Sequence, residues 1–282
     1  MPLSQETYIT RRPKSEVLSK YIAYYYFNKS DLEGYVKTFM FYPHYRNALT
    51  IYNNSEISFT DKGSTVLPKA DKDFEIIYTG IHLQSRTGKI LAPFDKIGVV
   101  FQALGINHFI DEPLSKIMPK SPKSDFNYFG NTFHEHLDNV YNTSDLDEKV
   151  TLLDAFFESQ CHPFEEQRLL HAVTFMFKEE MSIFKISEAL KISRKTLLRL
   201  FQKHLNCSPK DFSNLVKFRK AIEIYQESKP SLTDLAYLND YYDQSDFIKH
   251  FKKVTGFNPK KFFCNLSHLG TEDTFWTLLK TK

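Results

Sequence analysis

Cysteine is scarce in this sequence, and the few cysteines present form no pattern. Cys161, Cys207 and Cys264 are odd in number, widely spaced and include no C-x-x-C pair. Such a set predicts neither a disulfide framework nor a cysteine-ligated zinc site. A reducing compartment is the simplest location for the chain.

Long apolar runs are also missing. No window reaches the ~18 uncharged apolar residues that a membrane-spanning helix needs. Residues 1–10 lack the apolar segment behind a basic patch that marks a secretory signal. We therefore expect a cytoplasmic protein with no membrane partner.

Histidines do not occur in a metal-binding pattern. His44, His82 and His108 are scattered, with no H-x-H and downstream glutamate on a strand pair. His134 and His136 do form H-x-H, but they fall in a helix predicted over 131–140, where positions i and i+2 point apart. The sequence predicts no metal, no cofactor and no catalytic centre.

The composition is that of a folded protein with an uneven charge. Hydrophobic residues make up 41% and aromatic residues 15% of the 282 residues, enough for two domains with their own cores. Residues 182–264 hold 16 Lys+Arg against 8 Asp+Glu, a balance of +8, whereas the remainder holds 21 against 26. A basic module that faces a polyanion is one interpretation, and a solvated lysine surface is the other.

An internal repeat organises this basic region. Four positions recur with an offset of 50 residues, and the lysine pairs Lys203/Lys253 and Lys210/Lys260 keep the same offset. The four repeated pairs are Leu197/Phe247, Phe201/Phe251, Pro209/Pro259 and Phe212/Phe262. A supersecondary unit used twice constrains the fold more strongly than composition does.

Each copy is predicted to be a short helix, a turn and a longer helix. In the first copy Ser193 is an N-cap for a helix whose apolar stripe is Leu197, Leu200, Phe201 and Leu205. In the second copy the turn is expected at 240–244, before the stripe Phe247, Phe251 and Val254.

A prolyl helix start follows each copy. Ser208-Pro209 and Asn258-Pro259 each place a capping side chain before a proline at the first helical position. The first of these helices should run to about Ser228, before Pro230. Roughly 17 residues at 1.5 Å each make a spacer of about 26 Å, which suits two helices in successive major grooves.

The residues of this region resemble the AraC/XylS family of bacterial transcription regulators. The resemblance covers about 182–263 and rests on the sequences ISRKTLLRLF (192–201) and SPK (208–210), then YDQSDF (242–247), FKK (251–253) and TGFNP (255–259). It implies two helix-turn-helix units joined by a long helix, double-stranded DNA as a ligand and RNA polymerase as a partner.

The resemblance also implies individual DNA contacts. By position, the residues that read bases are Lys195, Leu198, Arg199, Ser245, Asp246 and Lys249. Those that contact phosphates are Arg194, Thr196, Lys203, Gln244, Lys252 and Lys253. Four positions depart from the family pattern. Lys191 and Asp240 replace turn glycines, Ser187 replaces an alanine, and Asn239 replaces an apolar residue. We expect the first turn to be slightly rearranged, because lysine tolerates positive φ poorly.

The N-terminal half has the pattern of a small β-barrel or sandwich. Strands are predicted at 21–27, 36–42, 48–52, 74–83 and 96–102, separated by turn formers at 53–54, 61–63 and 87–88. Such a domain resembles the cupin-like sensor half of many regulators of the family, which implies a small-molecule effector. The aromatic run at 24–27 could line a pocket, but aromatic residues in a strand are more often core, so we assign no ligand site.

Two amphipathic helices are predicted between the halves, after an N-cap at 142–145. Their apolar stripes are Leu146, Val150, Leu153 and Phe157, and Leu169, Leu170, Val173 and Phe177. These stripes could pair two protomers in a homodimer or pack within one chain, and the sequence leaves both open.

The sequence thus predicts an α+β protein of four parts. They are a β-rich sensor or dimerisation domain (1–142), a helical linker (143–181), the tandem helix-turn-helix domain (182–264) and a C-terminal tail (265–282). The predicted function is that of a non-enzymatic, sequence-specific transcription regulator, with activation as the expected sign. Two alternatives are a DNA-repair enzyme that transfers alkyl groups to Cys161 or Cys207, and an architectural DNA binder without sequence preference.

Overall fold

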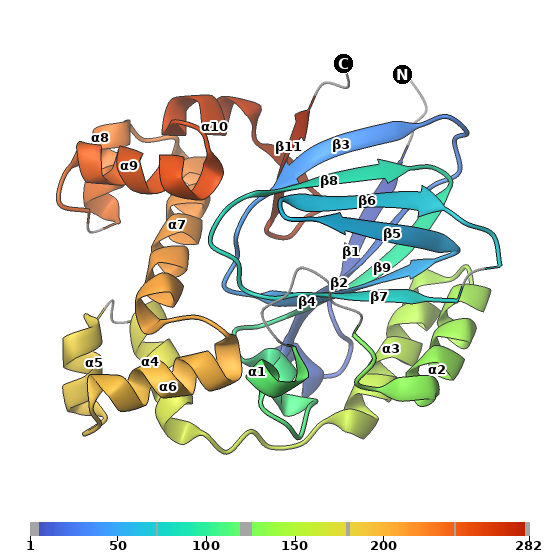
Figure 1. Cartoon of the computed structure of the whole chain (residues 1–282), viewed down its shortest axis with the longest axis horizontal. Coiled ribbons are helices and arrows are strands. Elements are labelled where there is room, and N and C mark those ends of the chain that lie inside the picture. The colour runs from blue at the N-terminus through green and yellow to red at the C-terminus, as the bar shows by residue number, and fades with distance from the viewer. Residues whose placement is uncertain (1–5, 72, 119–125, 179–180, 240, 280–282) are drawn as a thin grey trace.

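The chain folds into a sheet-rich N-terminal part and a helical C-terminal part (Figure 1). The computed structural model describes residues 6–71, 73–118, 126–178, 181–239 and 241–279. Within these ranges, no helix combines the length and the apolar character needed to cross a membrane. The predicted α+β class is confirmed.

Two sheets face each other in the N-terminal part. The first is antiparallel and contains, in spatial order, β1 (Thr7–Arg11), β2 (Ile22–Ser30), β9 (Phe94–Phe101), β4 (Asn47–Asn53) and β7 (Glu75–Thr79). The second contains β10 (Ser267–Leu269), β11 (Thr274–Leu279), β3 (Val36–Phe41), β8 (Arg86–Leu91), β6 (Gly63–Pro68) and β5 (Ser55–Thr60). Among the strand pairs of the described residues, only β6 with β8 is parallel.

The two faces of the first sheet have different neighbours. Along β9, Ile97, Val99 and Phe101 belong to the core shared with helices α2 (Gly130–Asn142) and α3 (Leu146–Gln160), whereas Lys96 and Val100 alternate with them and face the second sheet. Gly98 lies on the same face as Lys96 and Val100. The ring of Tyr26 covers it so closely that there is no room for a Cβ, which explains the glycine.

The five predicted strands are all present, and the described residues contain six further strands that the sequence pattern did not predict. Segment 87–88, predicted as a turn, lies inside β8. Gly88 is opposite Phe39 on β3, and a Cβ there would lie 2.5 Å from the phenyl ring. The glycine therefore makes room for an aromatic side chain on the neighbouring strand, which a local turn signal cannot reveal.

The segment 265–282, expected to be a tail, contains β10 and β11 instead. β11 pairs with β3, and Trp276 stacks on Phe39 with ring centroids 4.0 Å apart. The C-terminal segment is thus part of the second sheet.

The helices between the halves bury their apolar stripes within the chain. The stripe of α3 joins the core under the first sheet, and that of α4 (Gln167–Lys178) joins the core of the first helix-turn-helix unit. The shorter elements are η1 (Leu18–Lys20), η2 (Gly105–His108) and α1 (Leu114–Ile117).

Candidate nucleic-acid interface

The first helix-turn-helix unit consists of α5 (Ile183–Ala189) and α6 (Arg194–Leu205). Ser182 and Ser193 cap them, each accepting a hydrogen bond from the backbone N–H three residues on. In the turn, Lys191 adopts φ +52°, the left-handed conformation that favours glycine. The lysine therefore keeps the backbone of a glycine turn at some cost in strain.

The faces of α6 divide as its periodicity predicts. Leu197, Leu200, Phe201 and Leu205 are buried. Arg194, Lys195, Arg199 and Lys203 are exposed, while Thr196 and Leu198 are half-buried. The hydroxyl of Thr196 lies 3.0 Å from that of Ser193, so this threonine also takes part in the N-terminal cap.

A long helix, α7 (Pro209–Ser228), separates the two units. Ser208 caps it with Pro209 at the first helical position, and Lys229 ends it at φ +46° before Pro230. Its 20 residues correspond to about 30 Å, somewhat longer than the sequence estimate. The predicted end of this helix at Ser228 is confirmed.

The second unit consists of α8 (Leu232–Leu238) and α9 (Gln244–Thr255), followed by α10 (Pro259–Asn265). Asp243 caps α9 by accepting from the N–H of Asp246. Gln244, assigned to the turn from the sequence, begins the helix instead, because Asp243 supplies the cap. Asp240 lies outside the described residues.

All six predicted contact residues of α9 face outward. Gln244, Ser245, Asp246, Lys249, Lys252 and Lys253 are exposed, opposite buried Phe247, Phe251 and Val254. The apolar and proline positions that repeat at a spacing of 50 residues are buried in both copies, whereas the repeated lysine pairs Lys203/Lys253 and Lys210/Lys260 are exposed. The repeat thus includes core positions and two exposed lysine positions.

The two polar departures lie in the core of the short helices. The hydroxyl of Ser187 donates to the carbonyl of Ile183 at 2.9 Å, and the amide of Asn239 donates to the carbonyl of Leu235 at the same distance. The donor of each side chain therefore has a backbone acceptor four residues earlier, whereas the buried Oδ1 of Asn239 has no hydrogen-bond partner among the described residues.

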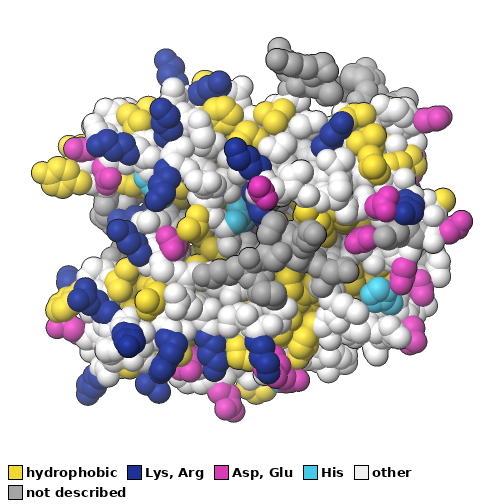
Figure 2. Space-filling view, viewed as in Figure 1, with side chains coloured by type: hydrophobic (Ala, Val, Ile, Leu, Met, Phe, Trp, Pro, Cys, Tyr) yellow, Lys and Arg dark blue, Asp and Glu magenta, His cyan; other side chains and the backbone are white. Residues whose placement is uncertain are grey.

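The exposed charge of both units gathers on one part of the molecule. Figure 2 shows Lys and Arg side chains over the region where Figure 1 draws α5, α6, α8 and α9. Such a surface, with two capped helices that present basic side chains, is chemically suited to a nucleic-acid backbone and to base edges.

The sheet-rich part contacts the C-terminal ends of α6 and α9. Asn107 donates to the carbonyl of His204 on α6 (3.3 Å). The backbone N–H and hydroxyl of Ser85 donate to the carbonyls of Val254 (2.8 Å) and Thr255 (3.2 Å) on α9.

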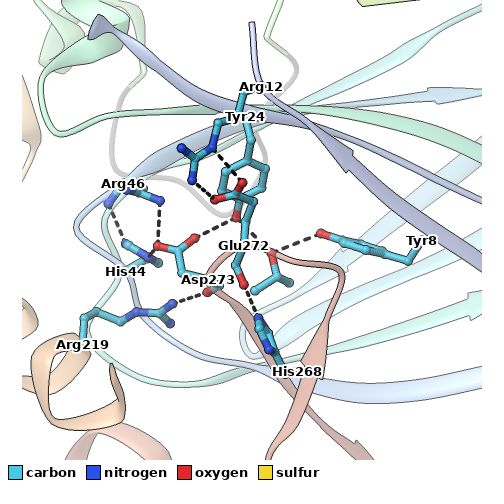
Figure 3. Close-up of polar contacts among 10 residues, drawn as sticks. Tyr8, Arg12, Tyr24, His44, Arg46, Arg219, His268, Glu272 and Asp273 are labelled. Atoms are coloured by element: carbon cyan, nitrogen blue, oxygen red, sulfur yellow. Dashed lines mark hydrogen bonds and ion pairs between the residues drawn. The ribbon is translucent and has the colours of Figure 1, made fainter. Parts of the chain in front are cut away.

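A third contact joins the sheet-rich part to α7. It is made by a cluster of polar side chains with Asp273 at its centre (Figure 3). Its carboxylate accepts from Arg46 at 2.7 Å and Tyr24 at 2.9 Å and lies 2.8 Å from His44, while its carbonyl accepts from Arg219 of α7. Burial raises the pKa of Asp273, but His44, Arg46 and Arg219 outweigh it and hold the pKa well below its usual range. Burial, followed by the charge of Arg219, lowers the pKa of His44 to about 3.

Sequence reasoning missed this polar cluster. Asp273 belongs to the segment taken as a tail, and its partners come from β2, the segment after β3, and α7. No local spacing connects these positions, so no sequence signal could have found them.

A cavity of about 910 Å³ lies between the sheets and the C-terminal helices. Tyr24 and Tyr26 line it, whereas Tyr25 and Phe27 alternate into the helix-covered core. The aromatic run at 24–27 is therefore divided between a pocket and a core, and not core alone as we expected. The volume falls within the ~300–1,000 Å³ that ligand pockets commonly have.

The fold and exposed faces of the C-terminal region define a DNA-binding helix-turn-helix domain. A family model described as "Helix-turn-helix domain" matches residues 186–264. The chain is 27% identical over 86 residues to the lactose operon transcription activator of Staphylococcus xylosus, covering 29% of this chain and 31% of that protein. It is 26% identical over 85 residues to the transcriptional activator RhaS of Enterobacter sp. (strain 638), covering 30% of this chain and 31% of that protein.

The C-terminal domain is a helix-turn-helix domain of the AraC type. The match spans about a third of the length of these curated relatives. Among solved structures, ToxT from Vibrio cholerae is similar with a TM-score of 0.44 and 12% identity, over 92% of this chain and 97% of that one.

Proposed function

We propose that this protein is a sequence-specific, DNA-binding transcription regulator in which α6 and α9 read two successive major grooves. The observation that carries the proposal is the pair of N-capped helices with exposed basic faces, set at the two ends of the 20-residue α7. The length of α7, about 30 Å, is close to the ~34 Å between successive major grooves.

The proposed contacts follow from side-chain chemistry. Arg199 can pair bidentately with guanine O6 and N7, Asp246 can accept from cytosine N4, and Leu198 can touch a thymine methyl. Lys195, Ser245 and Lys249 complete the base-reading set. The phosphate set is Arg194, Thr196, Lys203, Gln244, Lys252 and Lys253.

Activation, with RNA polymerase as the partner, is the proposed sign of regulation because both relatives are named activators. Transcription of a promoter that carries the selected site, with purified RNA polymerase, tests it. An increase on adding the protein is expected, and a decrease would make the protein a repressor.

A small-molecule effector is proposed to bind in the 910 Å³ cavity. Residues from both parts of the chain form its wall, including Tyr26, Trp276, Asn206 and Arg219. An occupant would therefore contact the sheets and the DNA-binding domain together.

A homodimer would have to use a surface other than the stripes of α3 and α4, which are buried within the chain.

The alkyl-transfer alternative receives no support from the thiols. Cys207 is buried, and burial, with Glu158 nearby, raises the pKa of Cys161 and so disfavours its nucleophilic thiolate.

Selection from a random duplex library, followed by affinity measurements at two salt concentrations, tests sequence-specific binding. Recovery of a site that spans two successive major grooves is expected. Arg199→Ala should weaken binding to it, whereas Lys20→Ala, an exposed lysine in η1, should not. Equal affinity for random and selected duplexes would instead indicate an architectural binder.

A further inference from the structure

Part of the cavity wall is an aromatic chamber that a lysine amine also lines. Tyr8, Tyr26, Phe39, Tyr52 and Trp276 supply its rings, and Lys96 of β9 supplies the amine. Tyr8 stacks on Tyr26 with centroids 5.4 Å apart, and Phe39 stacks on Trp276 at 4.0 Å. These stacked pairs form flat apolar walls.

The Lys96 side chain is only 3% exposed, and aromatic rings surround its nitrogen. The Nζ atom lies 5.3 Å from the ring centre of Trp276, 5.5 Å from that of Tyr52 and 5.8 Å from that of Phe39. Within the part of the chain that the structure describes, no carboxylate, carbonyl or hydroxyl oxygen accepts a hydrogen bond from it. The amine therefore borders the cavity without a polar partner from the protein.

A second buried lysine in the same region, Lys37, has the ion pair expected of an amine with a structural role. Lys37 of β3 also lies close to Trp276, with its Nζ 4.4 Å from the ring centre, but it donates to both carboxylate oxygens of Glu6, at 2.8 and 2.6 Å, and does not line the cavity. Lys37 is an ion-paired core residue. Lys96 differs from it in having no counterion and in facing open space.

Burial of Lys96 favours the uncharged amine, against the attraction of the ring faces for its ammonium form. Burial, together with the neighbouring charge of Lys37 and against that of Glu6, lowers the pKa of Lys96 to about 7. The faces of aromatic rings carry negative potential and would disfavour an organic anion at this position. The guanidinium groups of the cavity, Arg46, Arg86 and Arg219, belong to side chains outside this ring of aromatic residues.

We propose that Lys96 is a reactive amine that captures a small aromatic aldehyde from solution as an imine. The unprotonated Nζ attacks the carbonyl carbon and forms a carbinolamine. Loss of its hydroxyl group and of the remaining amine proton, together one water molecule, gives the C=N bond. No oxidant or reductant is consumed, and the aromatic body of the aldehyde packs against the chamber walls.

Capture could be read out at the DNA-binding domain because the chamber adjoins the Asp273 cluster. Trp276, three residues after Asp273 on β11, forms part of the chamber, and Asp273 bonds Arg219 of α7. This regulatory consequence rests on the proposed function, whereas the capture reaction is independent of it.

The test is reductive trapping on the full chain with trans-cinnamaldehyde and sodium cyanoborohydride at pH 7, followed by peptide mapping. We expect labelling of Lys96 to be at least tenfold faster than that of other lysines. Lys96→Met should remove this label, whereas Lys62→Met, which replaces an exposed lysine at the same cavity, should retain it. Comparable label on many exposed lysines, with none preferred, would overturn the proposal.

Further measurements keep the result independent of whether Lys96→Met folds. In the wild-type protein, the rate of Lys96 labelling should rise through about pH 7 and be slowed by cinnamyl alcohol, which has the same shape but no carbonyl. Binding of cinnamate that depends on Lys96, without labelling by the aldehyde, would show an ion-pairing lysine and overturn the proposal. Altered affinity of the trapped protein for its selected duplex would support regulation. Unchanged affinity would refute only the regulatory consequence.

Discussion

The recognition helices α6 and α9 bury equivalent side chains but expose different chemistry. Phe201 and Phe251 occupy the same place in the two units, each fully buried. On the outer faces, α6 carries four cations and a half-buried leucine, whereas α9 carries three lysines and has Gln244, Ser245 and Asp246 in its first turn. The core of the unit can thus be repeated while its exposed surface diverges, because helix packing constrains only one face.

The largest effect should come from breaking what the two units share. Phe201→Ala and Phe251→Ala should each destabilise the fold by about 3–5 kcal/mol, because each leaves a cavity in a packed core. Urea unfolding measures this. Tyr242→Ala, which replaces a side chain that is 89% exposed, is the control and should change stability by less than about 0.5 kcal/mol. A loss from only one of the phenylalanines would refute the equivalence of the cores.

A smaller effect should distinguish the reading surfaces. Arg199→Ala should cost about 1–3 kcal/mol of binding to the selected duplex and relax specificity at one base pair. Asp246→Ala should relax a different base pair, in the half of the site that α9 occupies. Affinity for a panel of single-base variants of the site measures both. Relaxation of the same base pair by both changes would contradict one groove for each helix.

Backbone strain offers a third test, limited to the first unit and the spacer. Lys191→Gly and Lys229→Gly should each stabilise the protein by about 0.5–1 kcal/mol, because both lysines adopt positive φ. The matched control, Lys195→Gly inside α6, should destabilise it by about 1 kcal/mol. Thermal unfolding gives the sign in each case, and a loss of stability in Lys191→Gly would show that the turn is not strained.

The smallest effect concerns phosphate contacts. Lys203→Ala and Lys253→Ala should each reduce the slope of log affinity against log salt by about 1, without changing sequence preference. Titrations at several salt concentrations measure the slope. A change for Lys203 alone would mean that only the first unit engages the backbone at this repeated position.

Much of the DNA-binding domain could be predicted because its signals are local. Ser193, Ser208 and Asn258 cap the helices as expected, and the apolar spacing identifies the buried faces. Weak or ambiguous signals caused the errors elsewhere. β5 is largely polar, β6 begins with glycine and ends with proline, and Gly88 resembles a turn residue until its partner strand is known.

The sequence by itself determined the capped helices, the repeated core and the outward basic faces of the two units. These properties depend on residues within a few helical turns of one another. Only the tertiary structure decided that Lys96 has no counterion among the described residues, that Asp273 connects the second sheet to α7, and that Tyr24 and Tyr26 face a cavity. Those properties depend on which distant strands pair, as β11 does with β3, and pairing across more than 200 residues leaves no trace in local spacing.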